Sequence, residues 1–190
     1  MKTSLLALAV LAATVPFAAA AQQAPGALNY NYVEAGYAHT NGDGDAKADG
    51  FGANASVALT PNVHLFGGWN SQEIDNTPVD VDHWRIGAGY NHALSPRADL
   101  VARAAFERYD VSHGGGKVDG YSVEVGSRGM LATNLEGYAF AGYEDSKDFE
   151  GDFYGRLGAN YAFTPNWSVT GDVKFADGAN QWFVGPRFSW

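Results

Sequence analysis

Charged residues recur at alternate positions within short apolar segments of this chain, a spacing that could build an electrostatic network inside a sheet. Arg103 and Glu107 lie four residues apart on one strand face, so we expect them to share partners such as Arg85, Glu124 or Arg128 on neighbouring strands. Six acidic and six basic residues have this placement: Glu34, Arg85, Arg103, Glu107, Glu124, Arg128, Glu136, Glu144, Arg156, Asp172, Lys174 and Arg187. Such a balanced set can pair and fill an interior, or it can line a narrow charged pore.

Ser112 and His113 are the second candidate for chemistry, because they adjoin each other in a polar stretch and His39 could lie nearby. A nucleophile needs a base and an orienting group together, and the chain has no G-x-S-x-G elbow. We therefore assign no catalytic residue. If these side chains do act together, the alternative function is that of an outer-membrane lipid hydrolase active at the rim of a barrel.

Acidic residues also gather in polar stretches, where they could contact divalent ions bound to lipid headgroups. They are Asp43, Asp45, Asp49, Glu73, Asp75, Asp80, Asp145, Asp148 and Glu150. The segment that starts at Asn41 resembles a calcium loop, but Ala46 and Gly52 stand where that loop needs glycine and glutamate. His64 and His83 lack paired ligand spacing and are expected to fill an interior by hydrogen bonding. We assign no metal and no cofactor.

Strands must position these side chains, because the apolar residues alternate with a period of two. Ten segments show the pattern: 28–39, 51–60, 63–73, 82–92, 99–110, 119–130, 135–145, 152–163, 167–175 and 181–190. Their lengths suit the 9–11 residues that cross a bilayer when tilted. The sequence therefore predicts an all-β fold, a single ten-stranded antiparallel up-and-down transmembrane β-barrel, with eight strands as the alternative.

Two kinds of connection separate these segments. Tight-turn signals recur at Thr60-Pro61-Asn62, Ser95-Pro96-Arg97, Thr133-Asn134 and Thr164-Pro165-Asn166. Longer polar stretches lie between them at 40–50, 74–80, 111–117, 145–151 and 176–180. This asymmetry is typical of bacterial outer-membrane barrels, so we expect periplasmic termini and five longer extracellular loops.

Lysine usage indicates which face of the barrel meets lipid. After Lys2, lysine occurs at four positions, of which the first three lie in predicted loops: Lys47, Lys117, Lys147 and Lys174. A water-facing exterior would carry lysine along its strands, so we expect the polar face to point inward. Aromatic residues near strand ends are expected to form belts at the membrane surfaces. They are Tyr30, Trp69, Trp84, Tyr90, Tyr121, Tyr143, Tyr161, Trp167, Trp182 and Trp190.

Composition and the N-terminus limit the class of protein further. Residues 1–21 have the pattern of a secretory signal peptide, with cleavage between Ala21 and Gln22 or one residue earlier, which leaves an outer-membrane barrel domain at 22–190. Twelve basic against 21 acidic residues disfavour nucleic acid as a partner. The chain has no cysteine, so disulfide and thiol chemistry are excluded.

The C-terminal strand alternates and ends on an aromatic residue. Phe188 and Trp190 resemble the assembly signal of bacterial outer-membrane barrels. We therefore expect the barrel insertion machinery and periplasmic chaperones as partners, together with outer-membrane lipid and lipopolysaccharide.

Several motifs resemble one family over essentially the whole chain. They are Tyr30-Asn31-Tyr32-Val33-Glu34, Gly89-Tyr90-Asn91-His92, Asp119-Gly120-Tyr121-Ser122-Val123-Glu124, Ala141-Gly142-Tyr143-Glu144-Asp145, Asp152-Phe153-Tyr154-Gly155-Arg156-Leu157-Gly158-Ala159 and Val184-Gly185-Pro186-Arg187-Phe188-Ser189-Trp190. The family is the small outer-membrane barrel family called Ax (Ax twenty-one), described as a diffusible-signal-factor-like, sulfation-dependent factor. The resemblance implies a non-enzymatic barrel, structural or narrow and porin-like, that can be released in vesicles as a surface or signalling-related factor. It implies no catalytic residues.

Overall fold

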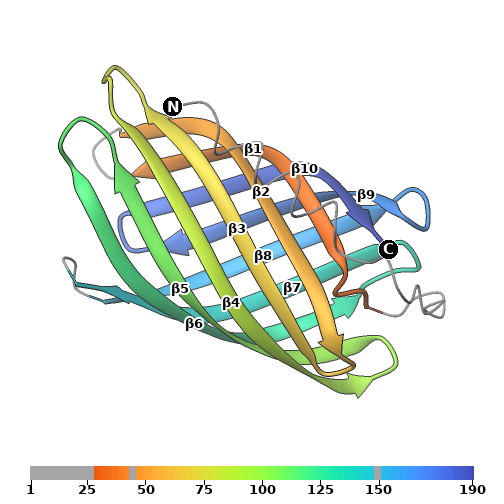
Figure 1. Ribbon diagram of the computed structural model, residues 1–190. Coiled ribbons are helices and arrows are strands. Elements are labelled where there is room, and N and C mark those ends of the chain that lie inside the picture. Colours follow the sequence, from red (N-terminus) through yellow and green to blue (C-terminus); the bar gives the residue numbers. More distant parts are fainter. Residues whose placement is uncertain (1–27, 43–45, 148–150) are drawn as a thin grey trace.

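The protein is a closed antiparallel barrel of ten strands (Figure 1). The computed structural model describes residues 28–42, 46–147 and 151–190; the expected signal peptide and its cleavage site at Ala21 and Gln22 lie outside this part. The strands are β1 (Tyr32–Gly42), β2 (Lys47–Thr60), β3 (Val63–Ile74), β4 (Asp80–Ser95), β5 (Ala98–Val111), β6 (Gly116–Met130), β7 (Leu135–Ser146), β8 (Asp152–Ala162), β9 (Trp167–Ala176) and β10 (Ala179–Ser189). The ten-stranded prediction is confirmed, and the eight-stranded alternative is wrong.

Closure follows from the pairing of the first and last strands. Each strand pairs with its neighbours along the chain, and β1 pairs with β10 in a register that sets Glu34 opposite Arg187. The closed sheet has no free edge, as a membrane-spanning sheet requires, because lipid offers no partner for backbone N–H and C=O groups.

The two ends of the barrel carry different connections. At what we call the turn end, strands are joined through 61–62, 96–97, 131–134 and 163–166, in agreement with the predicted turns. At the opposite loop end, the connections are 43–46, 75–79, 112–115, 147–151 and 177–178. The predicted long loops were therefore too long, because strand pairing continues into the polar stretches.

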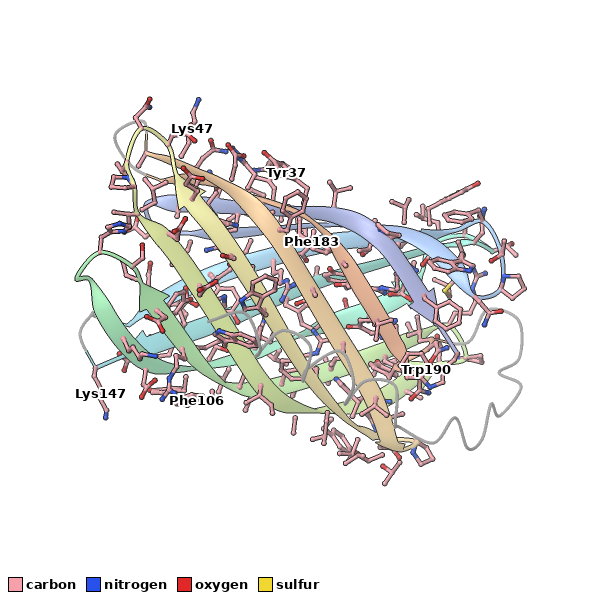
Figure 2. All side chains as sticks on the ribbon, turned by 45° about the horizontal axis from the view of Figure 1, so that its top comes forward. Tyr37, Lys47, Phe106, Lys147, Phe183 and Trp190 are labelled. Atoms are coloured by element: carbon pink, nitrogen blue, oxygen red, sulfur yellow. The ribbon has the colours of Figure 1, made fainter. Side chains whose placement is uncertain are left out.

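The strands differ in length around the barrel. β4, β5 and β6 have 16, 14 and 15 residues, whereas β8, β9 and β10 have 11, 10 and 11. The last connection is a tight turn in which Gly178 has a φ of 74°, a conformation that favours glycine. Figure 2 places Lys47 and Lys147 at the loop end and Trp190 at the turn end.

The barrel is apolar outside and polar inside. Phe51 and Ile86 on the outer face are 69% and 68% exposed, whereas Glu107 and Arg128 in the interior are 4% and 3% exposed. This inverted distribution is the one expected of a transmembrane barrel. Among the described residues there is no helix that is long and apolar enough to span a membrane.

The first strand and one aromatic residue differ from expectation. Residues 28–31 precede β1, although the sequence pattern predicted a strand over 28–39. Tyr30, expected in an aromatic belt, is only 6% exposed and lies in the interior at the turn end. Tyr30 lies four residues before Glu34, so strand alternation puts both side chains on the inner face. The sequence therefore held a signal that would have placed Tyr30 in the interior. Trp84, Tyr90, Tyr121, Tyr161, Trp167 and Trp182 do lie exposed on the outer face.

Candidate functional site

The turn end of the lumen is filled by the residues that precede β1. Leu28 and Tyr30 pack with Val101 and Phe140 in the main buried apolar cluster. The Tyr30 ring also stacks on His64 at 4.6 Å between centroids, and its hydroxyl donates a 2.8 Å hydrogen bond to Asp99. Leu28 and Tyr30 therefore fill this end of the lumen with apolar side chains, and the Tyr30 hydroxyl is hydrogen-bonded to the barrel wall.

Hydrogen bonds from three parts of the barrel hold this segment in place. The Asn29 side-chain amide donates to the Trp190 carbonyl at 3.1 Å, and Arg128 donates to the Asn29 carbonyl at 2.8 Å. The Ala58 backbone N–H donates to the Asn31 side chain at 2.9 Å. We call residues 28–31 the plug segment, because they are both buried in the mouth and bonded to its rim.

Next to the plug segment lies a chain of deeply buried ion pairs. Arg128 contacts Glu136 at 2.7 Å, and Arg187 lies 2.7 Å from Glu34 and 3.8 Å from Glu136. The four side chains are between 3% and 8% exposed. Glu136 thus bridges two arginines on β6 and β10 in a deeply buried part of the interior.

Two pairs continue the network through the middle of the lumen. Arg103 lies 3.1 Å from Glu124, whereas Glu107 lies 3.4 Å from Arg85 and 2.6 Å from His83. Arg103 and Glu107 therefore have different partners, both of them among the residues named from the sequence. His83, expected as a hydrogen-bonding filler, does hydrogen-bond to Glu107 and Asn70. His64 is fully buried but fills the interior by stacking on Tyr30, since its ring nitrogens have no hydrogen-bond partner among the described residues.

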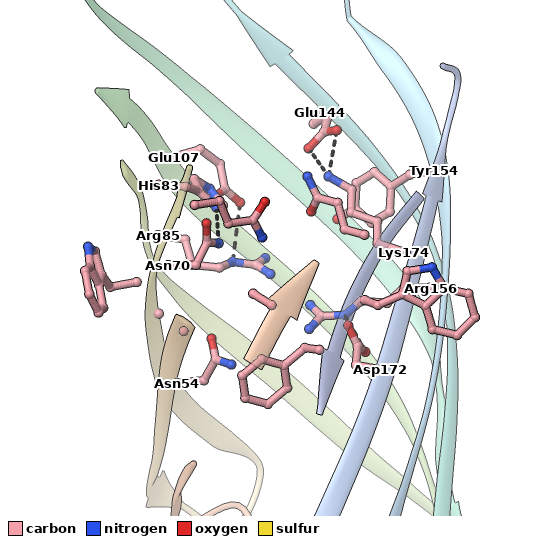
Figure 3. A pocket seen from close by; sticks show the side chains of 18 residues that line it. Asn54, Asn70, His83, Arg85, Glu107, Glu144, Tyr154, Arg156, Asp172 and Lys174 are labelled. Carbon is pink, nitrogen blue, oxygen red and sulfur yellow. Dashed lines mark hydrogen bonds and ion pairs between the residues drawn. The ribbon is translucent and has the colours of Figure 1, made fainter. Parts of the chain in front are cut away.

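The loop-end half contains two further pairs on the opposite wall (Figure 3). Arg156 lies 2.8 Å from Asp172, and Lys174 lies 2.5 Å from Glu144. Figure 3 shows them facing the group formed by His83, Arg85 and Glu107 across the interior. The structure thus places all twelve charged residues predicted from the sequence in the lumen, each in an ion pair with another of the set.

Three interior residues were missed in the sequence pattern. Asp99 bonds to Tyr30, Tyr138 donates to Asp172 at 2.6 Å, and Tyr154 donates to Glu124 at 3.0 Å. Asp99 has the same parity as Arg103, which could have revealed it. Glycine makes room for the rings, since a Cβ at Gly142 would lie 2.2 Å from the Tyr154 ring.

Within the described residues, two small cavities lie in the packed interior, beside a wider hollow of about 340 Å³ at the loop end that Glu107, Glu144 and Lys174 also line. One, of about 80 Å³, lies in the loop-end half and is lined by polar residues that include Asn54, Asn70 and Lys174 (Figure 3). The other, of about 40 Å³, lies in the middle of the lumen among arginines. Each is large enough for a few water molecules or a small ion.

The residues considered for catalysis lie on the rim. Ser112 and His113 contact each other at 3.1 Å between Oγ and Nδ1, and the Asp80 backbone N–H donates to the same Oγ at 2.7 Å. His39 instead pairs with Asp49 at 2.6 Å on β1 and β2, which β3 and β4 separate from the Ser112 hairpin. The structure does not bring these three residues together.

Part of the acidic set lies outside the described residues, namely Asp43, Asp45, Asp148 and Glu150. Within the described part, no group of three or more His, Cys, Asp or Glu side chains could hold a metal ion.

The aromatic C-terminus packs at the turn end. The Phe188 ring lies 5.1 Å from Trp167 and 6.5 Å from Trp190 between centroids. The Trp190 backbone N–H donates to the Asn31 carbonyl at 3.3 Å. The proposed assembly signal therefore also closes the seam between the two ends of the chain.

Comparison with known proteins gives three kinds of result. No curated protein matches the chain. Among solved structures, it is similar to the KdgM porin (10% identity, TM-score 0.46, covering 86% of this chain and 99% of that one) and to the NanC porin (8%, 0.47, 84% and 100%). It is also similar to the translocator domain of the autotransporter NalP from Neisseria meningitidis (13%, 0.44, 98% and 98%). The profile of the outer membrane protein beta-barrel domain matches residues 5–182, and the chain belongs to that family.

Proposed function

We propose that this protein is a non-enzymatic structural barrel of the outer membrane whose lumen is closed at the turn end. The observation that carries this proposal is the plug segment, with Leu28 and Tyr30 buried at 8% and 6% exposure in the mouth. The paired charges behind it support the same conclusion, because barrels with few strands are filled by their own side chains. Charged side chains that line a water-filled passage are hydrated, so they would not need such pairing.

Single-channel recording in planar bilayers tests this proposal. The refolded protein is expected to show no steady conductance, whereas the double variant Leu28→Ala/Tyr30→Ala is expected to conduct or to open more often. Tyr161→Ala is the matched control, because that tyrosine is 49% exposed on the outer face. Steady conductance of the unchanged protein would contradict the closed lumen.

A narrow porin-like passage is the second candidate, and the two polar cavities favour it. They lie one behind the other between the loop end and the plug segment, and Arg85 and Arg156 line both. In this alternative the plug segment moves aside, and Glu107→Gln changes ion selectivity while it leaves the unfolding midpoint nearly unchanged. A large loss of stability without conductance would favour the structural role.

The rim-active lipid hydrolase is a separate alternative that rests on Ser112 and His113. Its test is lipid turnover by the purified protein, with loss of turnover in Ser112→Ala. His39 pairs with Asp49 on β1 and β2, so it does not join Ser112 and His113, which supports the non-enzymatic role.

The narrower assignment to the Ax family rests on the motif resemblance, and with it the release in vesicles as a surface or signalling-related factor. Immunodetection in isolated vesicles and outer membranes tests the release.

The orientation of the barrel is a further part of the proposal, with periplasmic termini and extracellular loops. Protease access to a tag inserted at 112–115 in whole cells tests this orientation. Outer-membrane lipid and lipopolysaccharide are proposed partners.

Phe188 and Trp190 are proposed as the assembly signal read by the insertion machinery, with periplasmic chaperones carrying the unfolded chain. Deletion of Trp190, or Trp190→Asp, is expected to leave precursor in the periplasm. Trp182→Asp is the matched control for a tryptophan on the same strand that is 50% exposed. If the protein without Trp190 still reaches the outer membrane as a folded, heat-modifiable barrel, Trp190 is not part of the assembly signal.

A further inference from the structure

The cavity in the middle of the lumen has an unusual wall. Its volume is about 40 Å³, and five arginines line it: Arg85, Arg103, Arg128, Arg156 and Arg187. Only two carboxylates, Glu34 and Glu136, share that wall. The loop-end cavity is different, because its three basic residues Arg85, Arg156 and Lys174 face the three acids Glu107, Glu144 and Asp172.

The imbalance arises because several carboxylates sit on the far side of their arginines. Glu107 and Asp172, the partners of Arg85 and Arg156, line the loop-end cavity instead. Glu124, the partner of Arg103, does not line the middle cavity either. The pairs neutralise the lumen as a whole, yet the middle cavity faces an excess of positive charge in a place of low dielectric constant.

Guanidinium nitrogens at this wall also lack hydrogen-bond acceptors. Within the described residues, neither Nη1 of Arg128 nor Nε of Arg103 has a hydrogen-bond partner, and both atoms are shielded from solvent. The Arg128 side chain is 3% exposed. These enclosed atoms do not touch the open space of the cavity, but their positive charge has no acceptor beside it and adds to the excess at the wall.

We propose that the middle cavity is a binding site for one small inorganic anion of the size of chloride. The volume accommodates a halide or about three waters. The positive excess selects the anion over water, because the anion supplies the missing negative charge. This site does not depend on whether the lumen conducts, so it stands apart from the function proposed above.

A substitution at Phe66 can place a carboxylate of the protein where the anion would bind. Its ring centroid lies 5.2 Å from the Arg85 guanidinium carbon and 5.4 Å from that of Arg103, and the residue lines the cavity. Phe66→Glu places a tethered carboxylate between the two guanidinium groups. Phe66→Leu removes the ring without adding charge, and it is the matched control.

The first experiment is anomalous diffraction at the bromine edge from crystals of the purified protein grown in bromide. The second follows thermal unfolding in one detergent while chloride replaces gluconate at constant ionic strength. We expect one bromide peak beside Arg103 and Arg128, and a melting temperature that rises with chloride and saturates. Phe66→Glu should abolish the peak and the chloride dependence, and Phe66→Leu should retain both.

Arg103→Gln gives a second variant in case Phe66→Glu fails to fold. Loss of one donor group is expected to weaken halide binding by about tenfold, which corresponds to about 1.4 kcal/mol. Arg108→Gln is its control, because Arg108 lies outside the lumen and pairs with Asp119. No bromide peak, a peak without a response in solution, or equal chloride dependence in the two Phe66 variants would overturn the proposal.

Discussion

The two ends of the lumen use the same kinds of residue in different surroundings. At the turn end, the pair of Arg128 and Glu136 is 3% and 8% exposed and lies beside the plug segment. At the loop end, the pair of Lys174 and Glu144 is 17% and 27% exposed and lines a cavity of about 80 Å³. An ion pair therefore cannot be valued by its distance alone. Water replaces a lost partner more readily at the more exposed loop end than at the turn end, where the pair lines a smaller cavity of about 40 Å³.

Removal of a carboxylate at the turn end should have the largest effect. Glu136→Gln leaves Arg128 and Arg187 without their shared partner in the most deeply buried part of the lumen, and the expected loss of unfolding free energy is about 3–5 kcal/mol. Urea unfolding of the barrel in one detergent measures it. A loss below about 1 kcal/mol, the range of exposed pairs, would show that water reaches this end as well.

The plug segment supplies the next effect. Tyr30→Phe keeps the ring but removes the hydrogen bond to buried Asp99, so stability should fall by about 1.5–3 kcal/mol, the range for bonds to charged groups. Tyr161→Phe on the outer face is the control and should unfold as the unchanged protein does. If both variants behave alike, the hydroxyl of Tyr30 does not hold the plug segment.

The middle of the lumen should show coupling between paired residues. A double-mutant cycle on Arg103→Met and Glu124→Gln should give an interaction free energy between about 0.5 and 3 kcal/mol, because the two side chains are in direct contact. The cycle on Arg103 and Glu107 should be closer to additive, since these residues pair with Glu124 and Arg85 respectively. Equal coupling in both cycles would mean that the network responds as one unit.

The loop end should show the smallest effect. Glu144→Gln is expected to cost less than about 1 kcal/mol, as for solvated pairs, because water can hydrate Lys174. The effect should shrink further in 1 M salt, where the screening length is about 3 Å. Unfolding curves of Glu144→Gln and Glu136→Gln at low and high salt compare the two ends directly. Equal losses of unfolding free energy in the two variants would show that the two ends do not differ.

The sequence was sufficient to predict the architecture, because alternation is a local property of each strand. Alternation places Glu34, Arg103 and Arg187 on the polar face without knowledge of any neighbour, and lysine usage indicates that this face points inward. Local turn chemistry identified the turn at Thr164-Pro165-Asn166. The sequence was not sufficient for strand ends in polar stretches, where pairing with a neighbouring strand continues β4 and β6 beyond the apolar residues.

The choice of partners was decided only by the tertiary structure. Lys174 on β9 reaches Glu144 on β7, and Glu136 bridges Arg128 and Arg187 from different sides of the barrel. Such contacts depend on how far the strands are staggered when the sheet closes, and the stagger is a property of the whole barrel. The plug segment has the same origin. Alternation already directs Tyr30 inward, and only the closed mouth determines that it is buried against Val101, Phe140 and His64.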